Sequence, residues 1–207
     1  DLLETVSSHS EYLYTHSVGT SLYAIMLAHK LKWKSPPTMF KVATAGLLAD
    51  IGLKNFDPSL FKKSKTGWSA KQDKIYTEHP ATGMTVISNI KSIPSDVGQI
   101  ILHHHENCDG TGYPAGLRTS QINPVAKLIS VADVFCNSIM GAFGDRPASP
   151  KEAIEWMCAL RKDNFELTYL KALVALFKME TPPSLLSDRV VSSELSGPNQ
   201  KRKKDSV

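Results

Sequence analysis

Apolar residues recur at helical spacing through most of this chain, and proline and glycine divide it into segments of helix length. Within residues 10–32 this spacing is followed by Leu13, Val18, Leu22, Ile25, Met26 and Leu31. The same pattern predicts helices over residues 39–50, 69–78, 80–90, 94–104, 124–140, 150–162 and 165–179. No stretch alternates apolar and polar residues over a useful length, so we expect an all-α fold.

Two stretches between the predicted helices, residues 51–67 and 106–123, are rich in glycine and proline and are expected to be irregular. After Pro182-Pro183 the sequence is rich in Ser, Pro, Asn and Lys, and it offers too little apolar surface to fold independently. We therefore expect one domain over residues 1–180 and a disordered basic tail over residues 181–207. A weak interaction segment is the alternative interpretation of the tail.

The composition excludes several classes of protein. With 207 residues, 42% of them hydrophobic, the chain suits one ordinary domain rather than two. No run approaches the roughly 18 apolar residues of a membrane span and no signal peptide is evident, so a cytoplasmic protein is expected. The three cysteines show no CxxC spacing, which argues against a disulfide framework or a cysteine zinc site. Much of the formal charge of +4 lies in residues 201–204, so no nucleic-acid polymer is expected as a partner.

Histidines and two aspartates gather at the ends and on the faces of the predicted helices. They are His16, His79, His103, His104 and His105, interleaved with Asp50 and Asp133. A helical bundle can project such side chains to a common point in its core. Imidazole and carboxylate ligands without thiolates suit iron, manganese or zinc in an open catalytic site. From the residues alone, ordinary helix-end and helix-cap roles for Asp50, His79 and Asp133 stay an alternative.

Five short motifs make the pattern more specific. They are THS at His16, LLADIG around Asp50, EHPATG at His79, HHENCDGTGYP over residues 104–114, and VADVF at Asp133. In order and spacing, residues 11–147 resemble the HD-GYP family, bacterial metal-dependent phosphodiesterases that hydrolyse cyclic-di-GMP, within the HD phosphohydrolase superfamily. The resemblance implies an HD-domain helical bundle with a metal site in its core.

The resemblance also implies roles for individual residues. One divalent ion would be held by Asp50, His79, His104 and His105, and a second by His16, Asp133 and the shared, catalytic Asp50. Iron or manganese are the ions expected. Tyr113, flanked by Gly112 and Pro114, would line the substrate pocket, and Arg146 would reach a phosphate. The expected partners are cyclic-di-GMP or a related cyclic dinucleotide, and a signalling protein.

The chain departs from the family pattern at several positions. Ala49 replaces the histidine of the HD dipeptide, Leu53 replaces a lysine, and Tyr12 stands where some relatives have a glutamate for a third metal. Cys136 replaces an aspartate, and extra residues precede Arg146. Three hypotheses follow. The chain is a cyclic-di-GMP phosphodiesterase, or a catalytically silent module that binds the nucleotide or a protein, or a generic HD phosphohydrolase for another nucleotide.

Overall fold

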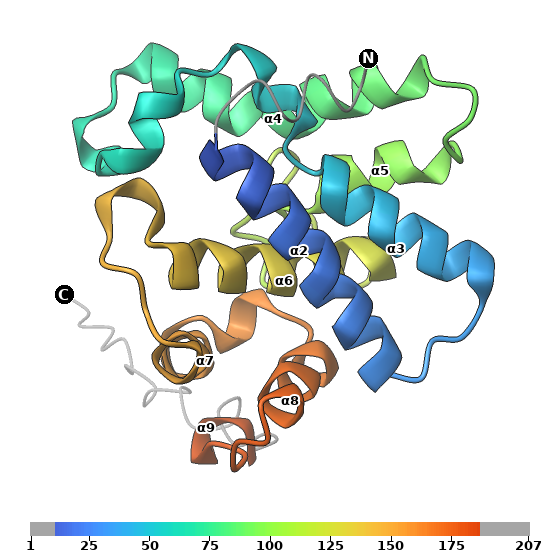
Figure 1. The fold of residues 1–207 in the computed structure, drawn as a ribbon, viewed down its shortest axis with the longest axis vertical. Coiled ribbons are helices and arrows are strands. Elements are labelled where there is room, and N and C mark those ends of the chain that lie inside the picture. Colours follow the sequence, from blue (N-terminus) through green and yellow to red (C-terminus); the bar gives the residue numbers. More distant parts are fainter. Residues whose placement is uncertain (1–10, 187–207) are drawn as a thin grey trace, which may run out of the picture.

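Helices α2 (Glu11–Lys30) and α6 (Pro124–Met140) cross at the centre of the molecule, and the other helices pack around them (Figure 1). In the computed structural model, which describes residues 11–186, these are α3 (Pro36–Leu48), α4 (Ala70–Ser88), α5 (Asp96–His103), α7 (Pro150–Leu160), α8 (Leu167–Leu176) and α9 (Pro183–Leu186). Residues 11–186 form no strand, only an isolated bridge between Asp109 and Arg118. The all-α prediction is confirmed.

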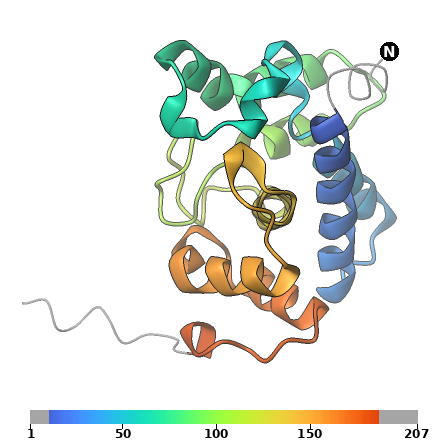
Figure 2. The ribbon, with the colours of Figure 1, turned by 60° about the vertical axis from the view of Figure 1, so that its left-hand side comes forward.

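Helix α6 is buried on most sides because it contacts α2, α3, α5, α7 and α8. Figure 2 shows it passing through the middle of the molecule, with α4 above it and α7 to α9 below. Its start is fixed by Pro124 and by the Asn123 side chain, which accepts a hydrogen bond from the Val125 backbone N–H at 2.8 Å. Gly141, at φ 69°, ends the helix in the left-handed conformation. Polar side chains on such a helix are therefore held in the interior.

The segment between α3 and α4 folds into three short 3₁₀ helices, η1 (Ile51–Asn55), η2 (Pro58–Lys62) and η3 (Lys65–Gly67). They cover a second apolar cluster, separate from the main core, whose buried members are Leu13, Leu53, Phe56, Leu60, Phe61 and Tyr76. Tyr113 and Phe143 pack against this cluster from two later segments. The segment expected to be irregular is therefore anchored by its aromatic residues.

One prediction of helix boundaries was wrong, because residues 69–78 and 80–90 do not form two helices broken at Pro80. They form the single helix α4, which begins with a capping box between Ser69 and Gln72 and contains Pro80. A proline inside a helix removes the N–H that would bind the carbonyl four residues earlier, here that of Tyr76. The His79 side chain donates to that carbonyl instead, at 2.5 Å from Nδ1 to O. The helix therefore continues without an unpaired carbonyl.

The expected boundary of the tail was also wrong. Residues 183–186 form α9, which packs against α7, and Leu185 is buried in the main core. The sequence around Leu185 is polar, but this one leucine holds the segment against the core, because its burial removes apolar surface from water. The rest of the predicted tail, residues 187–207, and residues 1–10 lie outside the described part of the chain.

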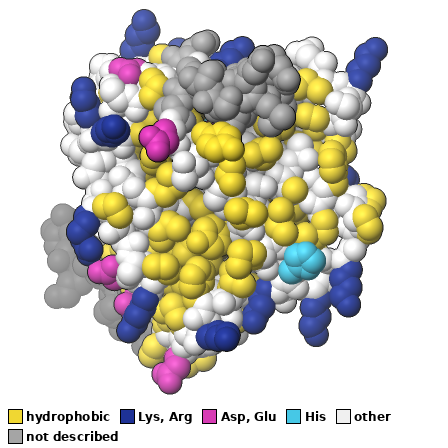
Figure 3. All heavy atoms as spheres, viewed as in Figure 1, with side chains coloured by type: hydrophobic (Ala, Val, Ile, Leu, Met, Phe, Trp, Pro, Cys, Tyr) yellow, Lys and Arg dark blue, Asp and Glu magenta, His cyan; other side chains and the backbone are white. Residues whose placement is uncertain are grey.

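No helix within residues 11–186 is both long enough and apolar enough to cross a membrane. Helix α2 nevertheless leaves Leu22 and Met26 exposed, and α3 leaves Phe40 exposed. Figure 3 shows hydrophobic side chains gathered over the middle of one face, with lysines and arginines mostly around the edge. Exposed apolar side chains are common on protein surfaces.

Candidate metal centre

Six side chains from five parts of the chain converge in the core of the bundle. His16 comes from α2, Asp50 from the start of η1, His79 from α4, His104 and His105 from the end of α5, and Asp133 from α6. They form two groups that share Asp50. The first group is Asp50, His79, His104 and His105, and the second group is His16, Asp50 and Asp133. In each group the potential ligand atoms lie within 4.8 Å of one another.

A close approach between η1 and α4 places Asp50 beside His79. A Cβ atom on Gly52 would lie 2.0 Å from the His79 carbonyl oxygen, so only glycine fits at this position. The Asp50 Oδ1 atom consequently lies 3.3 Å from Nε2 of His79. The backbone thus brings the carboxylate to the histidine cluster.

The orientation of two imidazoles in the first group indicates a cation site. His79 and His104 direct Nδ1 at the carbonyl oxygens of Tyr76 and Ile101, at 2.5 and 2.6 Å. A carbonyl only accepts hydrogen bonds, so both Nδ1 atoms carry the proton and a neutral ring leaves a lone pair on Nε2. The two Nε2 atoms lie 3.3 Å apart, and they lie 3.3 and 3.9 Å from Asp50 Oδ1.

Two lone pairs and a carboxylate that face one another repel unless a proton or a metal ion lies among them. Metal-binding histidines typically donate the other ring N–H to a carbonyl in this way, which fixes the tautomer that ligates. The arrangement therefore fits a divalent metal ion.

The charge states of His104 and His105 agree with this fit. Burial, followed by the neighbouring His79, lowers the pKa of His104 below its ordinary value. Burial, followed by His104, holds the pKa of His105 well below its ordinary value. Both rings are therefore neutral near pH 7, the form that binds metal. The buried Nε2 of His105 has no hydrogen-bond partner among residues 11–186.

The second group holds His16 between two carboxylates. Its Nδ1 lies 2.9 Å from Asp50 Oδ2, and its Nε2 lies 3.2 Å from Asp133 Oδ1. Neither contact has the geometry of a hydrogen bond, so both buried nitrogens lack an aligned partner within the described chain. Burial acts to lower the pKa of His16, but Asp133 and Asp50 outweigh it and raise that pKa to about 10. A metal ion in this group must therefore displace a proton.

Asn137, which the sequence analysis did not single out, orients Asp133. Its Nδ2 donates to Asp133 Oδ1 at 3.3 Å, and its Oδ1 accepts a hydrogen bond from the Tyr12 hydroxyl at 2.7 Å. Tyr12 also stacks on His16, with ring centroids 5.8 Å apart. Position 12 therefore supports both the histidine and the aspartate of the second group.

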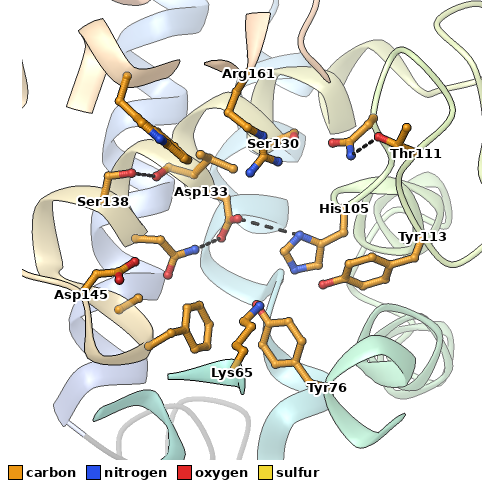
Figure 4. A pocket seen from close by; sticks show the side chains of 16 residues that line it. Lys65, Tyr76, His105, Thr111, Tyr113, Ser130, Asp133, Ser138, Asp145 and Arg161 are labelled. Atoms are coloured by element: carbon orange, nitrogen blue, oxygen red, sulfur yellow. Dashed lines mark hydrogen bonds and ion pairs between the residues drawn. The ribbon is translucent and has the colours of Figure 1, made fainter. Parts of the chain in front are cut away.

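A pocket with a volume of about 310 Å³ opens beside the two groups, near the lower end of the roughly 300–1,000 Å³ typical of small-molecule sites (Figure 4). His105 and Asp133 lie in its wall, together with Tyr113, whose ring packs on that of His105 with centroids 4.8 Å apart. The lysine and arginine in the wall are Lys65 and Arg161.

A buried glutamate shapes the loop that carries Tyr113. Glu106 is 1% exposed, and its carboxylate accepts hydrogen bonds from the backbone N–H groups of Ala115 and Leu117 at 2.7 and 2.8 Å. A Cβ atom on Gly112 would lie 2.2 Å from the Asn107 nitrogen, so the loop closes tightly only with glycine there. Glu106 directly follows the paired histidines in the motif HHENCDGTGYP, but no role was predicted for it.

Other predicted substrate residues lie apart from the pocket wall. Arg146 is exposed and pairs with Glu152, at 2.9 Å from Nη2 to Oε1, and it is not among the residues that line the pocket. Gly112 and Pro114 flank Tyr113 without lining the pocket themselves. His103 belongs to neither group, and its Nδ1 accepts a hydrogen bond from the Asn123 N–H at 3.4 Å.

Two family positions are occupied by buried apolar residues. Ala49 is 2% exposed and belongs to the main core, and Leu53 is 1% exposed and belongs to the second apolar cluster. Neither offers a ligand atom or a positive charge to the site.

Comparison with known proteins gives consistent results. The family model described as HD domain matches residues 2–167. The cyclic di-GMP phosphodiesterase PA4108 of Pseudomonas aeruginosa is 35% identical over 134 residues, which cover 64% of this chain and 32% of that protein. The 3'3'-cGAMP-specific phosphodiesterase 3 of Vibrio cholerae is 29% identical over 135 residues, which cover 63% of this chain and 28% of that protein.

Among solved structures, Bd1817, an HDG"Y"P protein from Bdellovibrio bacteriovorus, is similar with a TM-score of 0.67 and 26% identity, over 79% of this chain and 51% of that chain. The chain spans about a third of the length of the curated relatives that it matches. The similarity therefore concerns one part of those longer proteins.

Proposed function

This chain belongs to the HD domain family, and we propose that it is a metal-dependent phosphodiesterase domain of the HD-GYP type that hydrolyses cyclic-di-GMP. The observation that carries the proposal is the convergence of the Nε2 atoms of His79 and His104 on Asp50, next to a pocket lined by Tyr113. The names of the curated relatives, which include cyclic di-GMP phosphodiesterases, support the choice of substrate.

We assign two divalent ions to the centre, one to each group, with Asp50 shared between them. Nitrogen and oxygen ligands without thiolates favour iron or manganese. Ions bound there would supply an activated water for in-line attack on phosphorus and would offset negative charge in the transition state.

Residues of the chain itself orient the side chains of the metal centre and of the pocket wall. The carbonyls of Tyr76 and Ile101 fix the tautomers of His79 and His104, and Asn137 holds Asp133. Tyr113 packs on His105 at the pocket wall, where its ring can stack on a base of the nucleotide. A cytoplasmic location and a signalling protein partner stay predictions.

A catalytically silent module is the second candidate, because Ala49 and Leu53 remove a ligand and a positive charge that the family pattern contains. Such a module would bind the nucleotide through Tyr113 and the first group without turning it over.

Turnover of cyclic-di-GMP by the purified chain, loaded with Mn²⁺ or Fe²⁺, separates the two candidates. We expect the linear dinucleotide as product and loss of at least about a hundredfold in rate for Asp50→Asn, since this change alters a ligand of both groups. His29→Asn, at an exposed histidine outside the site, is the matched control and should leave the rate unchanged. Binding without any metal-dependent turnover would favour the silent module. Neither binding nor turnover would reject both candidates.

A further inference from the structure

Two cationic side chains that belong to no family motif quoted above reach into the pocket. Lys65 lies at the start of η3, and Arg161 directly follows α7. They are the lysine and the arginine among the lining residues. In Figure 4 they extend from opposite sides of the pocket toward Asp133 and His105. A ligand that fills this pocket can therefore contact both side chains.

Lys65 carries a positive charge that is held by aromatic rings rather than by an acid. Its Nζ lies 3.9 Å from the ring centroid of Tyr76, 4.0 Å from that of Phe143 and 5.5 Å from that of Trp68. Rings attract a cation through their faces but leave its N–H donors unpaired. Within residues 11–186 no carboxylate lies within ion-pair distance of this ammonium. The residue as a whole is exposed, but its amine lies among the rings. Burial of the amine lowers the pKa of Lys65 to about 8.

Arg161 is held in place through one edge of its guanidinium. Its Nε donates to the Asn164 side-chain oxygen at 2.6 Å, and Asn164 in turn donates to Asp109 and Thr111 at 3.2 and 3.3 Å. Asp109 and Thr111 belong to the same loop as Tyr113. Hydrogen bonds through Asn164 therefore connect Arg161 to the loop that carries Tyr113. Among residues 11–186 the arginine has no carboxylate partner, and the N–H groups at its tip are available to a ligand.

The two positions where the family pattern predicts cations do not supply them, because Leu53 is buried and apolar and Arg146 is exposed and paired with Glu152. A cyclic dinucleotide carries two phosphodiester groups, each with one negative charge. Arginine forks and lysine ammonium groups are the usual side chains that bind phosphate oxygens. The pocket wall thus offers one lysine and one arginine to a ligand with two phosphodiester groups, alongside the carboxylates of Asp133 and Asp145.

We propose that Lys65 and Arg161 bind the phosphate groups of a cyclic dinucleotide from opposite sides of the pocket, in place of the contacts that Leu53 and Arg146 do not make. The inference rests on the proposed function and assigns two binding residues to it. Lys65 comes from the segment between α3 and α4, and Arg161 comes from the turn between α7 and α8. A bound nucleotide would therefore bridge two parts of the molecule.

The test compares Lys65→Met and Arg161→Gln with the parent chain, all loaded with Mn²⁺. Calorimetry with the slowly hydrolysed phosphorothioate analogue of cyclic-di-GMP gives Kd, and turnover of cyclic-di-GMP gives KM and kcat. Losing a hydrogen bond between charged groups should raise Kd and KM by about tenfold or more. Lys63→Met and Arg118→Gln remove the same charges outside the pocket and are matched controls, so their Kd should equal that of the parent.

Metal content and unfolding temperature of each variant show whether the fold and the centre are intact. Arg161→Lys keeps the charge but loses the fork, so it should bind with intermediate strength, and it replaces Arg161→Gln if that variant unfolds. A parent that binds the analogue no more tightly than Lys65→Met and Arg161→Gln do would overturn this inference and leave the proposed function standing. Weakened binding in both variants, with no turnover by the parent, would support the inference while rejecting the enzyme. A parent that does not bind the analogue would overturn the inference, and its turnover would decide the proposed function separately.

Discussion

Hydrogen bonds at single ring nitrogens fix the orientation of two histidines of the centre. His79 and His104 donate their Nδ1 protons to main-chain carbonyls and present Nε2 to the centre. His16 has no such carbonyl partner and lies between two acids instead, where its raised pKa keeps it charged. The two groups therefore differ in readiness for a metal ion, although they share Asp50.

Replacing Ala49 with histidine tests whether the missing ligand limits the second group. We expect Ala49→His to increase the metal bound per chain and to raise cyclic-di-GMP turnover several-fold, because the new imidazole would add a fourth protein ligand beside Asp50. Ala49→Leu enlarges the same buried position without a ligand and should show neither gain. If the parent turns over as fast as Ala49→His, the missing histidine is not what limits the rate.

Helix α4 shows how a local irregularity can serve the site. Pro80 frees the Tyr76 carbonyl within the helix, and this carbonyl is the acceptor that orients His79. The proline predicted a break between two helices, because a single sequence does not show that a side chain would take the place of the missing N–H. The sequence predicted that a helix begins at residue 69, but it did not predict this compensation.

Replacing Pro80 with alanine should separate helix stability from metal binding. The backbone N–H that Pro80→Ala restores would compete for the Tyr76 carbonyl, so the metal-free protein should unfold at a higher temperature while metal affinity falls by about tenfold. Titration with Mn²⁺ and thermal unfolding of the metal-free protein measure the two effects. Pro182→Ala, at a proline distant in sequence from the site, is the control. Unchanged metal affinity in Pro80→Ala would show that the carbonyl does not orient His79.

Across the molecule, the sequence predicted which side chains converge in the core better than it predicted the residues of the pocket wall. The resemblance to the HD-GYP family implied the six side chains that the structure brings into two groups. Lys65 and Arg161 lie in connecting segments, and their position in the pocket depends on how those segments pack, which no local pattern encodes. Arg146 illustrates the converse, because it occupies a plausible motif position yet pairs with Glu152 at the surface.

The final described turn of the chain is part of the fold. Leu185→Ala should lower the free energy of unfolding by about 2–5 kcal/mol, as is typical of a leucine removed from a packed core, and chemical denaturation measures this loss. Leu186→Ala changes an exposed neighbour on the same helix and should cost far less. Equal, small effects in both variants would show that α9 contributes nothing to the core.

Anomalous scattering from crystals of the chain loaded with iron, recorded at the iron absorption edge, tests the metal centre most directly. The four potential ligands of the first group include two histidines aligned by carbonyls, whereas the second group has three potential ligands, one of them a charged His16. We therefore predict a strong peak among Asp50, His79, His104 and His105, and a weaker one beside His16 and Asp133. No peak in the bundle core, or a peak at the His16 side alone, would contradict the account.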